Sequence, residues 1–494
     1  MKNHSIRRLT VSYSSRSRPR KAAVPLTVLF VAAALLVPAI AATTSAEAAS
    51  LAPPLTRYPY LTDVVGGNAT VNFGTDQSKI SAVVKWGQAG VESCTAHTTT
   101  ATKTNISVNG VGEYQWKAQL SPLQPDTAYC YRVYFGTSQI DLLGSDPAPQ
   151  FVTQLPVGSS KPFSFAVLGD WGKTYASGNP DQANVMARIA ASGARFAVGT
   201  GDTGYPAGSQ KSYGDLEQTG LDISAVFGPQ YWTVVGKSIP MFNSEGNHAP
   251  TTTFLTNWPS AVAAAASGGR YQMDSYCCVD GITTKSYSSA WYAFDAGNAR
   301  FYILDATWDA ANVGTASQYQ VDYDVHWAPG AQHDEYTWLA NDLAAHPGQL
   351  KFAVFHYPLH SDQSTQNSDS FLDGPGHLEA LLNQYHVAIA FNGHAHIYQR
   401  NTAPPGGVIS YVTGGGGAAL SKIGGAGCAP TDAYGIGWSP STGTGSKCGS
   451  APTPTSATRV YHFLLVTVNG NTVTVTPTDE MGRTFDTQTY TFSG

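Results

Sequence analysis

The chain has 494 residues, a formal net charge of -5 and only 12% charged residues, whereas Gly (50), Pro (29) and Tyr (26) are abundant. This length allows about two to four domains. The composition is typical of a loop-rich exported protein with many short strands rather than of a helical cytosolic one. The charge balance gives no indication of a nucleic-acid-binding surface.

Residues 1–48 are predicted to be a signal peptide. Basic residues occur between 7 and 21, an apolar run follows at 24–42, and the small residues of "AEA" precede a cleavage site before Ala49. A membrane anchor is the alternative, but the apolar run contains two prolines and small residues follow it. No second apolar run is long enough to span a bilayer. The mature protein is therefore expected to be secreted and free of the membrane.

The six cysteines are candidates for disulfides, because an exported protein meets an oxidising environment. Pairing within each segment predicts two bonds, Cys94–Cys130 and Cys428–Cys448. Cys277 and Cys278 are adjacent, and either a vicinal bridge or two free thiols fits this pattern.

Residues 49–156 contain one short strand pattern after another, separated by Gly and Pro turns, which predicts a small antiparallel sandwich. The stretch "LQPDTAYCYRV" (123–133) resembles the penultimate strand of a fibronectin type III domain, whose tyrosine fixes the preceding corner by a hydrogen bond to the backbone. No catalytic constellation is visible here. The favoured interpretation is a scaffold or spacer that packs on the next domain.

From about residue 160 to 494 the pattern changes to strand, loop and helix, which predicts an α/β fold with its functional edge at the carboxyl ends of the strands. A helix is expected at 179–193, because Asn179 is suited to cap it, Pro180 to start it and Gly193 to end it. A second helix is expected at 332–346. An Asn-Gly turn between alternating residues predicts a closing hairpin at 456–479.

Polar residues close the apolar strands of this region: Asp170, Asp202, Asn247, His356, His394 and His396. A single Asp after a strand is usually a turn former, but these strands are expected to be neighbours in one sheet, so their ends converge. Burying several carboxylates without a cation is costly, and no Lys or Arg occurs among these endings. The pattern therefore predicts a metal site.

Together with Tyr205 there are more donors than one ion can hold. If Asp202 bridges, two ions about 3.5–4 Å apart are satisfied. Oxygen donors mixed with imidazoles suit iron, zinc or manganese. In "GHAH", side chains at i and i+2 of an extended chain point the same way, which would direct His394 and His396 to one place.

Five ordered blocks resemble the motifs of the purple acid phosphatases, which belong to the calcineurin-like metallophosphoesterases. The blocks are "GDWG" (169–172), "GDTGY" (201–205), "GNH" (246–248), "FH" (355–356) and "GHAH" (393–396). The resemblance covers about residues 160–400, and the preceding fibronectin-like segment also matches the plant-type architecture. It implies a calcineurin-like β-sandwich flanked by helices, preceded by a small all-β domain.

The resemblance also implies metal ligands. It assigns Asp170, Tyr205 and His396 to a first ion, Asn247, His356 and His394 to a second, and Asp202 to a bridge. The two histidines of "GHAH" would then serve different ions. A phenol ligand ionises near neutral pH only against a strong Lewis acid. This favours Fe(III) in the first position, with Zn, Fe or Mn in the second.

The activity implied is that of an acid phosphatase that hydrolyses small phosphate monoesters by attack of a metal-bound hydroxide. His248 is the candidate to protonate the leaving group, and His360 the candidate to contact a phosphate oxygen; each also fits a structural role. The sequence departs from the family at Ala249, where an acidic residue is usual, and in a short "VFHYPLH" block. These departures leave the roles of His248 and His360 open.

Two alternatives stay open at this point. One is a phosphodiesterase on the same core, acting on nucleotides or lipid head groups. The other is a non-catalytic extracellular binding or adhesion module with a degenerate site. The glycine-rich stretch 411–425 lacks the ending of a phosphate-binding P-loop and is expected to be a loop after a strand. His462 is expected to be structural. The natural substrate and the oligomeric state cannot be read from the sequence.

Overall fold

A computed structural model describes most of the chain after the predicted signal peptide. The described residues are 54–173, 179–216, 233–234, 237–248, 252–276, 285–306, 334–363, 365–366, 372, 377–424 and 428–493. The predicted signal peptide, Ala49, Ala249 and the pair Cys277 and Cys278 lie outside these ranges. No described helix is both long and apolar enough to cross a membrane.

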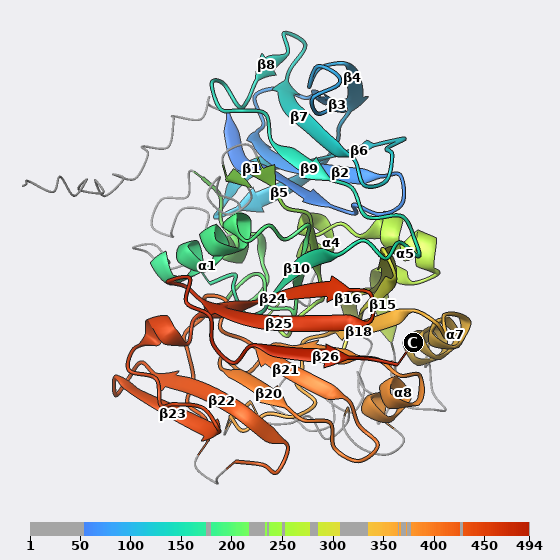
Figure 1. Cartoon of the computed structure of the whole chain (residues 1–494). Coiled ribbons are helices and arrows are strands. Elements are labelled where there is room, and N and C mark those ends of the chain that lie inside the picture. Colours follow the sequence, from blue (N-terminus) through green and yellow to red (C-terminus); the bar gives the residue numbers. More distant parts are fainter. Residues whose placement is uncertain are drawn as a thin grey trace, which may run out of the picture. The chain divides into compact units, whose positions relative to one another are not determined.

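The N-terminal strands form two sheets, as predicted for a sandwich (Figure 1). The first contains, in order, β1 (Leu55–Thr62), β2 (Ala69–Asp76), β6 (Val111–Leu120) and β5 (Thr102–Val108). The second contains β12 (Thr233–Val234), β13 (Lys237–Ser238), β9 (Gln150–Val152), β7 (Ala128–Phe135), β3 (Ala82–Gln88) and β4 (His97–Thr100), and β8 (Ile140–Asp141) pairs with β7. Strands β12 and β13 thus extend this sheet from much later in the chain.

A tyrosine closes a corner of this sandwich, as the resemblance of residues 123–133 implied. The Tyr129 hydroxyl accepts a hydrogen bond of 2.9 Å from the backbone N–H of Gln124. Next to it, Cys130 forms the predicted disulfide with Cys94, and their Cα atoms are 5.2 Å apart. The second predicted disulfide, Cys428–Cys448, is also present, with Cα atoms 5.4 Å apart.

The region after residue 160 is built on two further sheets. One contains β14 (Met241–Asn243), β11 (Ala197–Gly199), β10 (Phe163–Leu168), β24 (His462–Asn469), β25 (Thr472–Asp479) and β26 (Gln488–Thr491). The other contains β15 (Arg270–Tyr276), β16 (Lys285–Ala296), β17 (Ala299–Ile303), β18 (Leu350–Val354), β19 (Ile389–Asn392), β21 (Ile409–Thr413), β20 (Tyr398–Asn401), β22 (Asp432–Ser439) and β23 (Thr444–Gly449).

Aromatic side chains join the inner faces of these two sheets. Phe165 of the first sheet packs edge-on against Phe301, Phe352 and Phe391 of the second, with ring centroids 4.9, 5.4 and 6.2 Å apart. Such contacts contribute beyond the apolar area that they bury. They hold the two sheets face to face, so the strand ends of one sheet meet those of the other.

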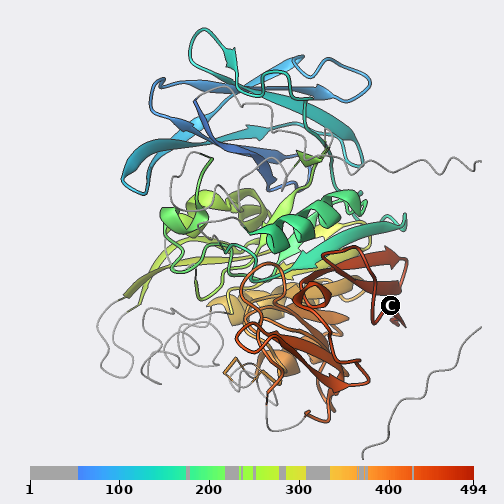
Figure 2. The same cartoon turned by 90° about the vertical axis from the view of Figure 1, so that its left-hand side faces the viewer.

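Helices flank this sandwich: α1 (Pro180–Ala191), α2 (Gln210–Tyr213), α4 (Thr252–Asn257), α5 (Ala261–Ser267), α7 (Asp334–Ala345), α8 (Leu378–Gln384) and the 3₁₀ turn η3 (Ala457–Arg459). The first begins as predicted, because the Asn179 side chain accepts a hydrogen bond from the Gln182 N–H and Pro180 occupies the first turn. It lies beside β24 (Figures 1 and 2). Leucines of α7 and α8 pack on the outer face of the nine-stranded sheet.

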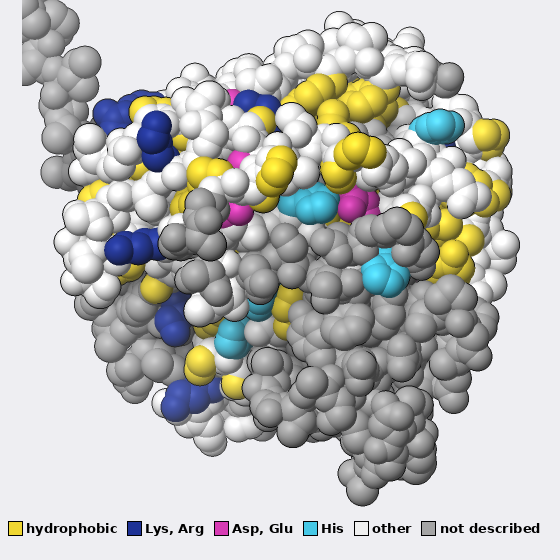
Figure 3. Space-filling model, turned by 90° about the horizontal axis from the view of Figure 1, so that it is seen from below, with side chains coloured by type: hydrophobic (Ala, Val, Ile, Leu, Met, Phe, Trp, Pro, Cys, Tyr) yellow, Lys and Arg dark blue, Asp and Glu magenta, His cyan; other side chains and the backbone are white. Residues whose placement is uncertain are grey.

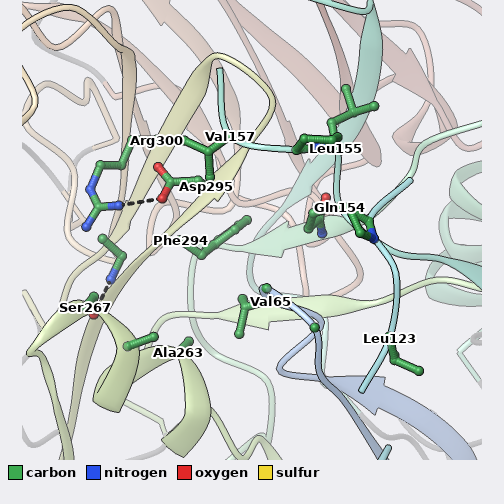
Figure 4. Close-up of a pocket in the computed structure, with 16 residues that line it drawn as sticks. Val65, Leu123, Gln154, Leu155, Val157, Ala263, Ser267, Phe294, Asp295 and Arg300 are labelled. Atoms are coloured by element: carbon green, nitrogen blue, oxygen red, sulfur yellow. Dashed lines mark hydrogen bonds and ion pairs between the residues drawn. The ribbon is translucent and has the colours of Figure 1, made fainter. Parts of the chain in front are cut away.

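The N-terminal strands and the strands after residue 160 share one hydrophobic core. All eight residues of β1 are buried, which a strand at the edge of a free sandwich would not achieve. The seam between the two regions is not filled everywhere, because a cavity of about 370 Å³ opens beside α5 (Figure 4). Residues of both regions line this cavity, among them Val65, Leu123, Gln154, Ala263, Phe294 and Arg300.

Candidate metal centre

The polar residues that end the apolar strands do meet, but they come from two sheets. Asp170, Asp202 and Asn247 follow β10, β11 and β14, which run parallel in the six-stranded sheet. His356 and His394 follow the parallel strands β18 and β19 of the nine-stranded sheet. The expectation of one shared sheet was therefore wrong. The site lies where the carboxyl ends of two face-to-face sheets meet.

Two carboxylates and an imidazole form the middle of this cluster. Ligand atoms of Asp170, Asp202 and His356 all lie within 4.8 Å of one another, and the three side chains are buried. Among the described residues, only histidines form ion pairs with either carboxylate. Burying two carboxylates this close without a permanent cation is costly. The donor set therefore fits a bound metal cation.

The Asn247 amide oxygen gathers one side of the cluster. His356 Nε2 lies 2.7 Å from this oxygen and His394 Nδ1 lies 3.0 Å from it. His356 Nε2 is also 3.4 Å from Asp202 Oδ2. Four donors from four different loops thus converge on one small volume, which is the arrangement expected around a single ion.

A second group lies on the other side of the carboxylates. The Tyr205 hydroxyl donates to Asp170 Oδ1 at 2.9 Å and lies 3.0 Å from His396 Nε2. His396 Nε2 is 3.3 Å from the same Asp170 oxygen. Burial and the nearby Asp170 carboxylate raise the pKa of Tyr205 well above its ordinary value. Without a cation the phenol therefore keeps its proton.

Asp202 carries its charge in this setting. Burial alone would raise its pKa, but His356 and His248 hold the pKa of the Asp202 carboxyl well below its usual range. The same interaction, opposed by burial, raises the pKa of His356 to about 9. The carboxylate between the two donor groups is thus a fixed negative charge.

Backbone carbonyls orient the imidazoles, a feature that the sequence did not reveal. His356 Nδ1 lies 2.8 Å from the carbonyl oxygen of Thr200, and His396 Nδ1 lies 2.7 Å from that of Ala419. Each contact leaves Nε2 facing the carboxylates, as in metal sites where a second hydrogen bond fixes the ring. Ala419 belongs to the glycine-rich stretch after β21. In the sequence, the glycine-rich stretch 411–425 at the end of a strand was the only indication of a loop at Ala419.

Glycines of the motif blocks allow this close approach. A Cβ on Gly246 would lie 2.2 Å from Asp202 Oδ1, and a Cβ on Gly393 would lie 2.7 Å from Asp170 Oδ2. Any larger residue would push the carboxylates out of place. The glycines of "GNH" and "GHAH" are therefore part of the site's geometry.

The backbone of "GHAH" is not extended, so the alternation of side chains along a strand is not what directs its two histidines. His394 has a φ of +66°, in the left-handed region. Its ring faces Asn247, whereas His396 faces Asp170 and Tyr205. The two histidines serve different donor groups, one on each side of the carboxylates.

Comparison with known proteins agrees with this geometry. Residues 163–398 match the calcineurin-like phosphoesterase family. Purple acid phosphatase 23 of Arabidopsis thaliana is 24% identical over 335 residues, which cover 61% of this chain and 62% of the relative. "Probable inactive purple acid phosphatase 1" of the same plant is 25% identical over 385 residues, which cover 69% of this chain and 56% of the relative. The chain thus spans less than two thirds of the length of either relative.

Among solved structures, a purple acid phosphatase from yellow lupin (Lupinus luteus) seeds superposes with a TM-score of 0.60 at 18% identity. The match covers 89% of this chain and 75% of the lupin chain, so the fold is the same. The chain carries a calcineurin-like phosphoesterase domain and is homologous to the purple acid phosphatases.

His248 lies at the rim of this metallophosphoesterase cluster. Its backbone N–H donates to Asp202 Oδ1 at 2.8 Å, and its Nε2 lies 3.9 Å from Asp202 Oδ2. Its ring lies 4.5 Å from the Tyr205 ring, between centroids, and its Nδ1 contacts the Pro206 carbonyl. The side chain is 30% exposed. Histidine side chains are visible beside acidic ones on the face shown in Figure 3.

His360 has a different environment in this purple acid phosphatase homologue. Its Nε2 lies 3.0 Å from Glu379 Oε1, and the same oxygen accepts a hydrogen bond from the Val408 N–H. Within the described part of the chain, His360 forms no hydrogen bond or ion pair with the cluster. A substrate contact by His360 stays a prediction. His462 is structural, because it is fully buried, lies 3.1 Å from Thr413 Oγ1, and burial lowers its pKa to about 4.

Proposed function

We propose that the chain is a secreted acid phosphatase that hydrolyses small phosphate monoesters at a binuclear metal centre. The observation that carries the proposal is the division of the clustered donors into two groups, with Asp202 close to both. Asp202 is in contact distance of His356 on one side, and its ligand atom lies within 4.8 Å of that of Asp170 on the other.

The residues would be shared between two ions as follows. Asp170, Tyr205 and His396 would hold the first, Asn247, His356 and His394 would hold the second, and Asp202 would be shared by both. The first ion would be Fe(III), because the phenol of Tyr205 needs a strong Lewis acid to lose its proton. The second would be Zn, Fe or Mn. When bound, the two cations would activate water and neutralise charge on the phosphoryl oxygens.

The chain's own residues then position the substrate and move protons. His248 is the only partly exposed histidine that contacts Asp202 among the described residues. The Pro206 carbonyl holds its Nδ1, so Nε2 faces the rim of the cluster and can give a proton to the leaving alkoxide. The His360 side chain, 15% exposed and held by Glu379, is the second candidate for a phosphate contact.

Export and domain organisation belong to the same proposal. Residues 1–48 would be removed as a signal peptide, 49–156 would form a fibronectin III-like domain, and 160–494 the catalytic domain. Two disulfides fit an exported enzyme.

Metal content and hydrolysis measured together test the proposal. The purified protein should contain about two metal ions per chain, cleave nitrophenyl monoesters faster than the corresponding diesters, lose activity on chelation and regain it with added metal. A matched pair of variants locates the site, since His356 and His462 are both fully buried. His356→Asn should lose metal and activity, whereas His462→Asn should retain the metal.

Two other outcomes would redirect the assignment. Faster cleavage of diesters would move the protein to the phosphodiesterases. A metal-loaded protein with no hydrolysis of either ester would place it with the binding modules, in line with the relative that is named as probably inactive.

A further inference from the structure

Two loops leave the metal cluster and run to the N-terminal sandwich. The first follows Tyr205 through α2 to Leu216, and the second follows His248 into α4 and α5. The Leu216 N–H donates to the backbone carbonyl of Thr56, at 2.6 Å, so the first loop is bound to β1 directly. Both loops carry a residue of the proposed site at one end and touch β1 at the other.

Arg57 of β1 joins the two loops with one side chain. Its Nη1 donates to Asn257 Oδ1 at 2.7 Å and to Gln115 Oε1 at 3.1 Å, and its Nη2 donates to Gln210 Oε1 at 2.9 Å. Gln210 lies five residues after Tyr205 and Asn257 nine residues after His248. The guanidinium is fully buried. Its planar fork fixes the two loop acceptors, Gln210 and Asn257, relative to β1 and to each other.

Other side chains of this N-terminal segment reinforce the second loop. The Tyr60 hydroxyl donates to the Asn257 carbonyl. The Asp63 carboxylate accepts hydrogen bonds from the N–H groups of Val262 and Ala263, at 3.2 and 3.0 Å, in the first turn of α5. The cavity in Figure 4 lies beside the same helix. Side chains of β1 and of Asp63, which follows it, therefore bond directly to the second loop.

The two loops also hold each other near the cluster. The Thr253 hydroxyl donates to the Gly208 carbonyl, and His248 Nδ1 contacts the Pro206 carbonyl. The Tyr205 and His248 rings are in contact, with centroids 4.5 Å apart. A displacement of either loop therefore moves both rings of the proposed site.

A third contact reaches the first motif block. Trp258, directly after α4, packs edge-on against Tyr60 of β1 and against Trp171, at centroid distances of 5.3 and 5.7 Å. Trp171 follows Asp170 in the chain, and both tryptophans are buried. Side-chain packing thus connects Tyr60 of β1, through Trp258, to Trp171, the residue next to Asp170.

We propose that β1 of the N-terminal domain is a positioning element of the catalytic site, in which Arg57 sets the relative position of the loops that carry Tyr205 and His248. This inference rests on the proposed function. It assigns the N-terminal domain a role in turnover beyond that of a spacer. Misplacement by about 1 Å of groups that act on the reacting atoms costs up to about 10²-fold in rate.

Arg57→Met tests the proposal, because it removes the three hydrogen bonds and keeps a long apolar side chain. The matched control is Arg132→Met, since the hydrogen bonds of Arg132 to described residues all lie within the N-terminal sandwich, to Asp141 and to the carbonyls of Gly144 and Asp146. Arg57→Met should lower kcat by about 10- to 100-fold with a smaller change in KM, and Arg132→Met should leave both near the wild-type values.

Two further readouts separate positioning from general loss of stability. Amide hydrogen exchange in 205–216 and 252–263 should accelerate in Arg57→Met but not in Arg132→Met, and metal content should stay unchanged. Arg57→Lys, which keeps a donor without the fork, should restore part of kcat. If Arg57→Met does not fold, Tyr60→Phe removes one bond to the same loop and should show the same pattern at smaller amplitude.

Equal effects of the Arg57 and Arg132 variants on kcat, in proportion to their loss of thermal stability, would overturn the proposal. So would an Arg57→Met enzyme with unchanged exchange in both loops. Should the wild type bind metal and cleave no phosphate ester, the proposed function fails, yet the exchange measurement still decides whether Arg57 holds the loops.

Discussion

Two aspartates that each accept a hydrogen bond from a tyrosine, Asp486 and Asp170, have their charge balanced in different ways. Near the C-terminus, Asp486 accepts a hydrogen bond from Tyr398 at 2.7 Å and a bidentate pair from Arg400 at 2.8 Å to each oxygen. At the proposed site, Asp170 accepts from Tyr205 at 2.9 Å, and the nearest cation candidate is His396, at 3.3 Å.

This difference separates a structural pair from a binding site. The Arg400 guanidinium is a permanent cation, so the cluster around Asp486 is complete within the chain. Among the described residues, only imidazoles form ion pairs with Asp170 and Asp202, and imidazoles are neutral metal ligands when unprotonated. Lys173 Nζ lies over the Tyr205 ring instead, 5.7 Å from its centroid. No arginine balances Asp170 among the described residues, whereas Arg400 balances Asp486. The site around Asp170 is therefore the one that fits a metal cation.

The largest effect should come from removing the bridging charge. We expect Asp202→Asn to lose metal and to lower turnover by at least about 10³-fold, more than the loss of a single transition-state donor. The control is Asp486→Asn, which should lower stability but keep the metal and the activity of the folded fraction. Metal analysis and steady-state kinetics on both variants measure this. Full metal occupancy in Asp202→Asn would show that Asp202 does not hold the metal.

His248 should give the next largest effect, and it should depend on the leaving group. His248→Ala is expected to slow alkyl phosphates by about 10²-fold or more, since an alkoxide needs a proton to leave. Nitrophenyl phosphates, whose leaving group is a weak base, should slow far less. Kinetics with both esters measure the contrast. Equal slowing would mean that His248 binds phosphate and that the proton comes from water or from His360.

Local signals in the sequence were sufficient for many elements. The cap of α1 at Asn179, the tyrosine corner at Tyr129, the hairpin of β24 and β25 and the two disulfides depend on residues close in the chain or in one segment. The candidate ligands could also be found, because each ends an apolar strand and the motif blocks occur in order.

Long-range arrangement could not be found in this way. Nothing local shows that Asp202 and His356 follow strands of different sheets, because the pairing of distant strands is decided by packing across the whole core. The φ of His394 and the carbonyl of Ala419 are equally invisible in a residue pattern. Arg57 is typical of an exposed strand position, and its burial depends on the catalytic domain that covers it.

Tyr205, beside Asp170, and Tyr398, beside Asp486, allow the two places to be compared by spectroscopy. If Tyr205 binds Fe(III), the protein should be coloured, and Tyr205→Phe should remove that absorption band while leaving the fold intact. Tyr398→Phe, at the arginine-balanced aspartate, should leave the band unchanged. Visible spectra with iron analysis measure this, and circular dichroism controls for folding. A colourless, iron-free and active wild type would place the enzyme among the wider metallophosphoesterases.

Asp63 is a buried carboxyl group whose environment differs from those of Asp170 and Asp486. Its substitution should have the smallest effect of the changes considered. No arginine or metal candidate balances it among the described residues; it accepts two backbone N–H bonds from α5. Burial raises its pKa to about 7, against the effect of those bonds and of Lys117. At a pH between the unfolded and the folded pKa, the Asp63 carboxyl is therefore protonated in the folded protein and ionised in the unfolded chain. The contribution of this proton to the free energy of unfolding is fully present below the unfolded pKa and is lost as pH rises through about 7.

Asp63→Asn tests this proton balance, because asparagine tolerates the positive φ of this position and keeps an oxygen acceptor. Between roughly pH 5 and 7 the wild type should lose about 2 kcal/mol of stability that the variant does not lose, since each pH unit in that window is worth about 1.4 kcal/mol. Urea unfolding of both proteins across pH measures the difference. Parallel stability curves would mean that Asp63 is ionised when folded and that the first turn of α5, with its two N–H donors, balances the charge.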